Sequence, residues 1–154
     1  YGTFGQKYGT FETRLRYAEA KGTWPSFFLL PVGQKGPYPE IDVFEAYGDT
    51  ACEGPGFLTS SLSTSSTVNK WKAWIPVSAP SDGWHVHKIV WTASKIEFYI
   101  DDVMTFSSTT VISQVAMYPI LIFGVGANNP GCRADATTPS KLTMDVDYLR
   151  VYAP

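Results

Sequence analysis

The chain has 154 residues, a length that predicts a single domain, and 44% of them are hydrophobic, which is enough to bury a core. A net charge of −2 without a long basic run argues against nucleic-acid binding. The longest apolar candidate, around Tyr118 to Val125, contains Pro119 and Gly124 and is too short to span a membrane. We therefore expect neither a nucleic acid nor a membrane among the partners.

Residues that favour strands form short runs along the whole chain. The runs are rich in β-branched and aromatic residues, and Gly, Pro, Asp or Ser bounds each of them. In chain order, we expect strands at Tyr8–Tyr17, Ser26–Leu30, Ile41–Tyr47, Phe57–Ser63, Trp84–Trp91, Lys95–Ile100, Val103–Phe106, Tyr118–Val125 and Leu142–Tyr152. Helix signals are nearly absent. The pattern predicts an all-β fold, an antiparallel sandwich or jelly roll, in one domain over residues 1–154.

Two local patterns make this expectation specific. Asp101 and Asp102 separate two of the runs and predict a hairpin turn, because Asp tolerates turn geometry. The last strand is expected to alternate between its two faces, with Met144, Val146 and Tyr148 on one face and Asp145, Asp147 and Leu149 on the other.

Three carboxylates lie close together in the run YPEIDVFEAYG, at Glu40, Asp42 and Glu45. Residues i and i+2 of a strand share a face, so Glu40 and Asp42 point the same way and Glu45 would point the opposite way. One extra residue, a β-bulge, would bring Glu45 onto the face of the other two. We expect such a bulge between Asp42 and Glu45.

Two carboxylates on one face can hydrolyse a glycosidic bond. A retaining glycosidase holds them about 5–5.5 Å apart, because one of them must reach the anomeric carbon directly. Three carboxylates this close cannot all ionise easily, so we expect at least one pKa to rise, as a general acid requires. Two other interpretations stay open, the solvated face of a surface strand and a calcium site.

Cysteines and histidines carry weaker signals. Cys52 and Cys132 both lie in segments with Gly and Pro, and they could form one disulfide, which would fit a secreted protein, or be two free thiols. His85 and His87 alternate on one predicted strand, so they share a face. A structural role is preferred to a paired-His metal site, because no third ligand is evident. We predict no metal and no cofactor, with structural calcium as the alternative.

Several segments together resemble glycoside hydrolase family 16, in the order in which that family has them. PEIDVFE resembles the family signature in its bulged form, Glu-x-Asp-x-x-Glu, and YGTFETRLRYAEAKGTWPSFFLLP resembles the strand and loop that lead into its active site. DGWHVHKIVWTASKIEFYIDD resembles a later hairpin, and GVGANNPG and DATTPSKLTMDVDYLRVY resemble the cleft loop and the closing strand. The resemblance runs from about Gly5 to Tyr152. It implies a concanavalin-like jelly roll with a concave substrate cleft, of laminarinase or β-glucanase type.

The resemblance also implies catalytic roles. Glu40 would be the nucleophile and Glu45 the general acid/base of a retaining mechanism without a cofactor. Asp42 would hydrogen-bond the nucleophile and tune the pair. Ile41 and Phe44, on the opposite face, would anchor the strand in the core.

The positions that the resemblance places in the substrate cleft are Trp24, Phe28, Asn128 and Asn129. Around them the sequence departs from the family pattern. Asn129 stands where a stacking Trp is common, and Phe28 replaces another common Trp. Thr59 and Ser63 stand at positions that are often His, and Ile122 at one that is usually Asn. We interpret intact acids beside a changed cleft as a sign of an unusual substrate or weak activity.

Other aromatic residues are assigned by their segments. Trp84 and Trp91 are expected mainly in the core, and Trp71 and Trp74 on a loop near the substrate. The chain is short for the family, so we expect some N-terminal strands to be missing, either because it is a fragment of a longer chain or because it is a minimal version. The sheet edge uncovered in this way would favour association.

The predicted function is an endo-acting retaining glycoside hydrolase, secreted or extracellular, that cleaves a β-linked polysaccharide. The preferred substrates are β-1,3- or mixed-linkage glucans, followed by a bacterial exopolysaccharide. The alternative is a carbohydrate-binding or structural jelly-roll module that keeps the acids with weak turnover or none.

Overall fold

The computed structural model describes residues 4–34, 36, 39–48, 57–63, 71–76, 83–126 and 133–154. These residues form ten strands and no helix: β1 Gly9–Tyr17, β2 Thr23–Pro31, β3 Glu40–Ala46, β4 Phe57–Ser63, β5 Trp71–Pro76, β6 His85–Trp91, β7 Ile96–Ile100, β8 Val103–Ser108, β9 Met117–Val125 and β10 Met144–Tyr152. All nine strands expected from the sequence are confirmed, with small shifts at their ends. The described part therefore contains no helix that could span a membrane.

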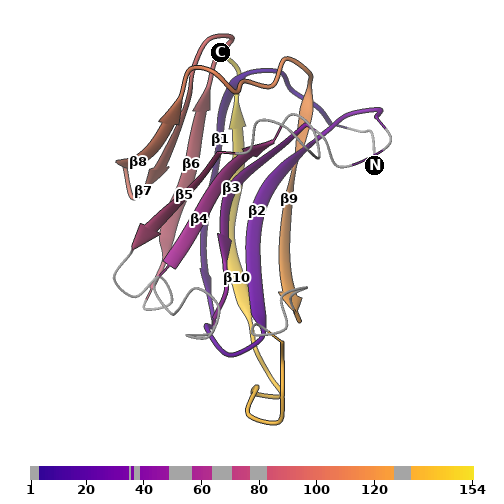
Figure 1. Cartoon of the computed structure of the whole chain (residues 1–154), viewed down its shortest axis with the longest axis vertical. Coiled ribbons are helices and arrows are strands. Elements are labelled where there is room, and N and C mark those ends of the chain that lie inside the picture. The colour runs from indigo at the N-terminus through magenta and orange to yellow at the C-terminus, as the bar shows by residue number, and fades with distance from the viewer. Residues whose placement is uncertain are drawn as a thin grey trace.

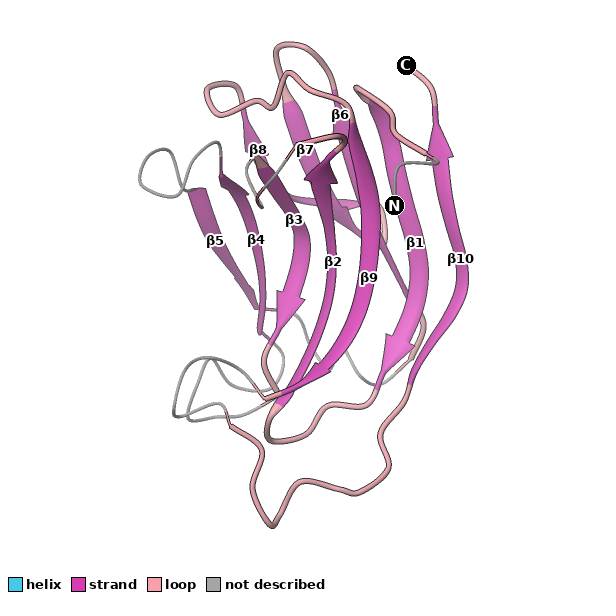
Figure 2. Cartoon of the chain, turned by 90° about the vertical axis from the view of Figure 1, so that its right-hand side faces the viewer, coloured by secondary structure: helices cyan, strands magenta, loops and turns pink. Residues whose placement is uncertain are grey.

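The strands form two five-stranded antiparallel sheets that stack face to face (Figure 1). The front sheet, which faces the viewer in Figure 1, has the order β5-β4-β3-β2-β9. The back sheet has the order β10-β1-β6-β7-β8. Figure 2 shows the two layers from the side on which β9 and β10 lie. This arrangement confirms the predicted antiparallel sandwich.

The two sheets bury their inner faces against each other. In β2, Phe27 and Leu29 point inward and are 0% exposed, whereas Trp24 and Phe28 on the other face are half-buried. Burying an aliphatic or aromatic side chain of this size is worth about 1.5–3 kcal/mol, so this period-two pattern fixes which face of the front sheet looks outward.

The hairpin turn predicted at Asp101 and Asp102 is confirmed. Both residues have positive φ, 48° and 63°, which is the geometry of a two-residue type I′ turn between β7 and β8. The Asp101 carboxylate accepts a hydrogen bond from the Val86 amide at 2.9 Å and lies 2.6 Å from Nδ1 of His85. Asp102 forms an ion pair with Lys88 at 2.5 Å. Each acid of the turn is therefore tied to β6.

The expectation of a loop around Trp71 and Trp74 is wrong for the backbone. Residues 71–76 form β5, which pairs antiparallel with β4 along its whole length. Lys72 and Pro76 weaken the local strand signal, but pairing with a neighbouring strand decides the conformation. The side chains of Trp71 and Trp74 lie outside the described residues.

The alternation predicted for the last strand is wrong beyond Asp147. The register between β1 and β10 shifts at this residue, so no residue of β1 lies opposite Asp147 in the strand pairing. Leu149 therefore pairs with the buried Thr13, and Tyr148 pairs with the outward-facing Arg14. A bulge that the period-two pattern does not show has exchanged the faces of Tyr148 and Leu149.

The two tryptophans assigned to the core behave differently. Trp91 is 1% exposed and its core position is confirmed. Trp84 is half-buried, and the guanidinium carbons of Arg14 and Arg16 each lie 4.9 Å from its ring. The core assignment of Trp84 is wrong, because it precedes β6 and packs against the outward-facing arginines of β1.

The side of the sandwich shown in Figure 2 carries one edge strand from each sheet, β9 and β10. Residues that point from these strands toward the interior are partly exposed, 58% for Val125, 43% for Val146 and 39% for Leu149. An uncovered edge is thus present among the described residues. Association through this edge stays a prediction.

Candidate active site

The predicted bulge lies in β3 between Asp42 and Glu45. Asp42 pairs with Ser61 of β4 and Glu45 pairs with Thr59, so two residues of β3 face a single residue of β4. The register with β2 skips Val43 as well. Val43 is therefore the extra residue, and the bulge is confirmed.

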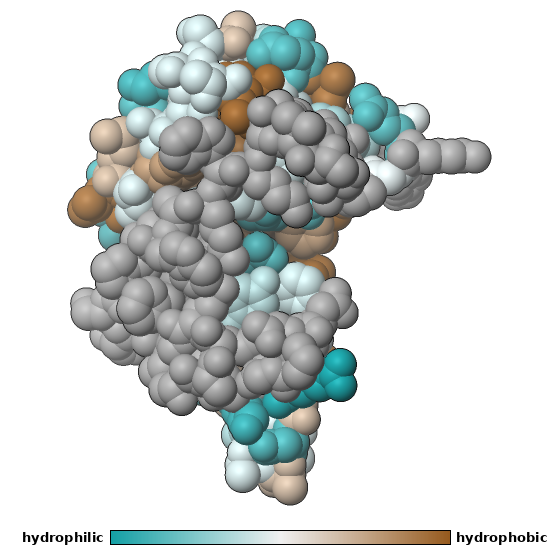
Figure 3. Space-filling view, viewed as in Figure 1, coloured by the Kyte–Doolittle hydropathy of each residue, from teal (hydrophilic) through white to brown (hydrophobic). Residues whose placement is uncertain are grey.

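The bulge places the three acids on one face of β3. Glu40, Asp42 and Glu45 pair with every second residue of β4, and residues two apart share a face; these partners are Ser63, Ser61 and Thr59. Ile41 and Phe44 point to the core and are 1% and 0% exposed, as predicted. We call the opposite, outward face of the front sheet the acid face. Figure 3 views this face, and the described residues visible near its centre range in colour from polar to apolar.

Glu45 is held by two aromatic donors. The indole Nε1 of Trp24 donates to Oε1 of Glu45 at 3.1 Å, and the hydroxyl of Tyr47 donates to the same oxygen at 3.5 Å. The two rings stack on each other, with centroids 5.9 Å apart and an interplanar angle of 17°. Both donors are neutral, so they orient the carboxylate without cancelling its charge. Sequence reasoning assigned Trp24 to sugar contact and missed both this contact and Tyr47.

Asp42 is the most enclosed of the three acids, 7% exposed. The hydroxyl of Ser61, its partner on β4, donates to Oδ2 of Asp42. A buried carboxylate needs such donors to offset its lost hydration. The sequence signal for Ser61 was present in the alternation of Thr59, Ser61 and Ser63, of which only the two outer residues were singled out.

Strands β2 and β9 extend the acid face to the other side of β3. Ser26 pairs with both Glu45 and Ile122, and Phe28 pairs with both Asp42 and Ile120. Ser26 is 1% exposed, and its hydroxyl finds no hydrogen-bond partner in the described part of the chain. An aromatic and two aliphatic side chains thus lie beside the acids, an apolar surface that suits the faces of sugar rings.

Behind the acids, the core side of β3 rests on an aromatic stack. Phe44 lies between Tyr17, at a centroid distance of 6.0 Å, and His87, at 4.1 Å. His87 is 1% exposed, and neither of its ring nitrogens has a hydrogen-bond partner among the described residues. Burial, with a smaller effect of His85, lowers the pKa of His87 from 6.5 to about 3. His87 is therefore a neutral core residue, which agrees with the structural role preferred from the sequence.

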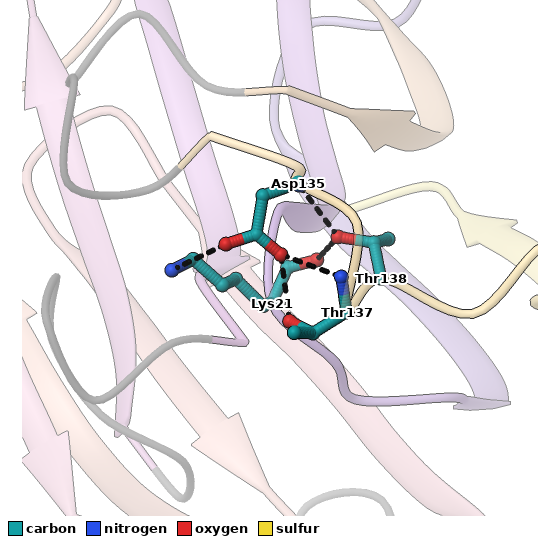
Figure 4. A network of polar contacts seen from close by, with 4 residues as sticks. All are labelled: Lys21, Asp135, Thr137 and Thr138. Atoms are coloured by element: carbon teal, nitrogen blue, oxygen red, sulfur yellow. Dashed lines mark hydrogen bonds and ion pairs between the residues drawn. The ribbon is translucent and has the colours of Figure 1, made fainter.

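The end of the front sheet near Trp24 is fixed by a polar network (Figure 4). The Asp135 carboxylate accepts hydrogen bonds from the amide and hydroxyl of Thr137 and pairs with Lys21 at 2.9 Å, while the Thr138 hydroxyl donates to the carbonyl of Lys21 at 2.8 Å. The Thr137 hydroxyl and the Lys21 ammonium are the main causes that hold the pKa of Asp135 well below its usual range. The network ties the loop before β10 to the turn between β1 and β2.

This tie requires a close approach at Gly22, in the same turn. Gly22 has a φ of +80°, and a Cβ there would lie 2.4 Å from Cα of Ala134. The carbonyl of Gly22 also accepts a hydrogen bond from the amide of Gly126, just beyond β9, at 2.7 Å. Both contacts bring the start of β2, which carries Trp24, to a fixed place beside β9.

Some of the predicted residues lie outside the described part of the chain, namely Asn128, Asn129, Cys52 and Cys132. Among the residues that are described, no three metal-ligating side chains lie close enough together to hold a metal ion. A surface cavity of about 230 Å³ lies on the back sheet, lined by Arg16, Tyr17, Ala18, Thr143 and Asp145, and it contains none of the three acids of β3.

Comparison with known proteins decides the family. A family model described as glycosyl hydrolases family 16 matches residues 2–149. The chain belongs to this family. The resemblance seen in the sequence is thereby confirmed, and so is the jelly-roll fold that it implied.

Two bacterial relatives of the family 16 chain carry names that describe their substrates. The chain is 29% identical over 154 residues to the endo-1,3-1,4-beta-glycanase ExsH of Rhizobium meliloti (strain 1021). This match covers 99% of the chain and 32% of ExsH. The chain is also 30% identical over 176 residues to the glucan endo-1,3-beta-glucosidase A1 of Niallia circulans. This match covers 95% of the chain and 24% of that protein. The chain thus spans about a third or less of the length of these relatives.

The fold matches that of a solved laminarinase of Thermotoga maritima MSB8. The TM-score to its catalytic domain is 0.86 at 23% identity, and the match covers 99% of this chain and 66% of the laminarinase chain. At this identity the match shows the fold. The family 16 chain therefore spans about two thirds of the jelly roll seen in the laminarinase.

Among the described residues, the positions where this family 16 chain departs from the common pattern lie on the acid face. Thr59 and Ser63 pair directly with Glu45 and Glu40. Ile122 is two strands away from Glu45, in the same row of paired residues. These changes thus lie beside the acids on the neighbouring strands.

Proposed function

We propose that this chain carries the catalytic centre of an endo-acting β-glucan hydrolase that retains the configuration of the anomeric carbon. The observation that carries the proposal is the bulge of β3, which brings Glu45 onto the face of Glu40 in a chain of glycosyl hydrolase family 16. A retaining mechanism needs two carboxylates on one face, one for the sugar and one for the leaving oxygen.

The reaction follows from the roles of the two glutamates. In the first step, protonated Glu45 gives its proton to the glycosidic oxygen while Glu40 attacks the anomeric carbon. The bond to the leaving sugar breaks, and a covalent glycosyl-enzyme forms on Glu40. In the second step, the Glu45 carboxylate takes a proton from water, whose oxygen attacks the same carbon and releases Glu40.

Neighbouring groups support these roles. Trp24 donates a hydrogen bond to Oε1 of Glu45, which aims the acid/base at one side of the acid face. Ser61 holds Oδ2 of Asp42, which lies between the two glutamates along β3 and orients the nucleophile. Each of these two contacts is made by a neutral donor, which orients the carboxyl group without adding a positive charge beside it.

The names of the relatives support the substrate class. An endo-1,3-1,4-beta-glycanase and a glucan endo-1,3-beta-glucosidase point to β-1,3- or mixed-linkage glucans as substrates. Polymers of this kind are too large to enter a cell intact, so we place the reaction outside the cell. Activity in the culture medium rather than in the cell lysate would be the matching observation.

The test is release of reducing ends from a panel of β-1,3-glucan, mixed-linkage glucan and a bacterial exopolysaccharide. We expect the wild type to cleave at least one polymer, and the isosteric Glu40→Gln variant to release no reducing ends from it. NMR of the first product should show the β-anomer before mutarotation. Equal inactivity of wild type and variant on every polymer would overturn the proposal, and binding to a polymer without cleavage would instead favour a carbohydrate-binding module. An α-anomer as the first product would overturn the retaining mechanism alone.

A further inference from the structure

A buried serine contacts the bulge of β3 from the core side. Ser60 lies in β4 between Thr59 and Ser61, at the point where two residues of β3 face one residue of β4. Its side chain is 2% exposed, and its hydroxyl donates a hydrogen bond to the carbonyl oxygen of Val43 at 2.8 Å. Val43 is the residue that the register of both neighbouring strands skips.

This hydrogen bond meets two needs at once. A bulge takes its extra residue out of the regular ladder, so the backbone groups of that residue need partners from elsewhere. Val43 is 4% exposed, which leaves little access for water to supply one. A serine that points into the core near the buried Leu62 also needs an acceptor, because a buried hydroxyl without one is unfavourable.

The bulge decides where Glu45 points. Without the extra residue, the strand alternation would turn Glu45 toward the core and away from Glu40. The separation of two carboxylates in a retaining site is narrow, and a displacement of about 1 Å can lower a rate by about 100-fold. Whatever holds the backbone at Val43 therefore acts on the distance between the two glutamates.

We propose that Ser60 is a positioning residue of the active site: its hydroxyl fixes the bulge of β3 and thereby sets the separation of Glu40 and Glu45. Ser60 is on the core side of β4 and touches neither the acids nor the acid face, so it acts through the backbone alone. This inference rests on the proposed hydrolase function for its kinetic consequence, while its structural consequence stands without it.

The test compares Ser60→Ala with a matched control. Ser108→Ala also removes a buried serine hydroxyl, 7% exposed, that bonds to backbone, in this case to the amides of Thr110 and Val111 in the loop after β8. For Ser60→Ala we expect kcat to fall by about 10-fold or more with little change in KM, because the reacting groups move while the sugar contacts stay. For Ser108→Ala we expect kcat and KM to match the wild type. Ser60→Thr, which keeps the hydroxyl, should restore most of kcat.

Hydrogen exchange followed by mass spectrometry gives a readout that needs no activity. In Ser60→Ala, the amides of residues 43–45 should exchange faster than in the wild type, and those of β7 and β8 should not. Unchanged exchange at residues 43–45, or a kcat that falls equally in both alanine variants, would overturn the inference. If the wild type itself cleaves no polymer, the proposed function fails, and the exchange result still decides whether Ser60 holds the bulge.

Discussion

Strands β3 and β10 look alike in sequence, but the acids that they carry have different kinds of partner. Each carries acids at alternate positions, and each contains a bulge next to an acid, Val43 in β3 and Asp147 in β10. In β10, Asp147 pairs with Arg14 at 2.7 Å and Asp145 with Arg16 at 2.8 Å, all of them largely exposed. In β3, Glu45 accepts hydrogen bonds from the indole of Trp24 and the phenol of Tyr47, and Asp42 accepts one from the hydroxyl of Ser61.

The difference shows how the same local pattern becomes a candidate site or a plain surface. The guanidinium groups of β1 neutralise the acids of β10 in open solvent, where such pairs contribute little. In β3, neutral indole, phenol and hydroxyl donors orient Glu45 and Asp42 on the acid face, and a fixed orientation of this kind is what proton transfer and nucleophilic attack require. The partner strand, more than the acidic strand itself, therefore distinguishes the two.

The largest effect expected from this comparison is on catalysis. Glu45→Gln should lower kcat by about 10²–10⁴-fold, because the amide can neither donate the proton to the leaving oxygen nor take one from water. Asp147→Asn is the matched change in the other bulged strand, and there we expect kcat within about twofold of the wild type, since the pair with Arg14 is an exposed surface pair. Steady-state kinetics on the polymer that the wild type cleaves decides between them. A comparable loss in both variants would remove the distinction between the strands.

The second effect concerns stability in acid, and it arises from His87, which stacks on Phe44 on the core side of β3. The pKa of His87 is about 3 in the folded chain against an ordinary value of 6.5, so the unfolded chain binds the extra proton first as the pH falls. The stability that depends on neutral His87 is complete above about pH 6.5 and is lost toward pH 3, at up to about 1.4 kcal/mol per pH unit. Two charged neighbours also act on the pKa of His87: His85 lowers it further and Asp101 raises it.

Urea denaturation at a series of pH values from 7 to 4 measures this loss. His87→Leu keeps an apolar side chain against Phe44 and cannot take up a proton, so its stability should fall less steeply with acid than that of the wild type. Identical slopes for the two proteins would contradict the assignment of His87 as a neutral core residue.

The smallest effects are expected at the ion pairs of β10. Arg14→Gln and Arg16→Gln each remove one exposed pair, worth less than about 1 kcal/mol, which corresponds to at most about 2–4 °C in Tm for a chain of this size. The loss should shrink as salt screens the pairs, and kcat should stay unchanged. A loss well above this range in high salt would show that β10 depends on its arginine partners for more than charge, for example through their contacts with Trp84.

The sequence predicted most of the strands and the bulge of β3 because both follow from short-range patterns. Ile41 and Phe44 on one side of three acids leave a single way to place Glu45 with the other acids. The bulge at Asp147 left no such mark, since Asp145, Asp147 and Leu149 alternate well as written. Residues 71–76 were missed for a related reason, because Lys72 and Pro76 weaken the local signal of a strand that pairing with β4 stabilises.

By itself, the sequence determined the family, the two-layer sandwich and the face that carries Glu40, Asp42 and Glu45, since alternation and composition act over a few residues. The tertiary structure decided which groups hold those acids: Trp24 and Tyr47 at Glu45, Ser61 at Asp42, and Ser60 behind Val43. Tyr47 lies two residues from Glu45, but the other three contacts span 17 to 21 residues of sequence, and the pairing of the sheet brings those donors within hydrogen-bond distance.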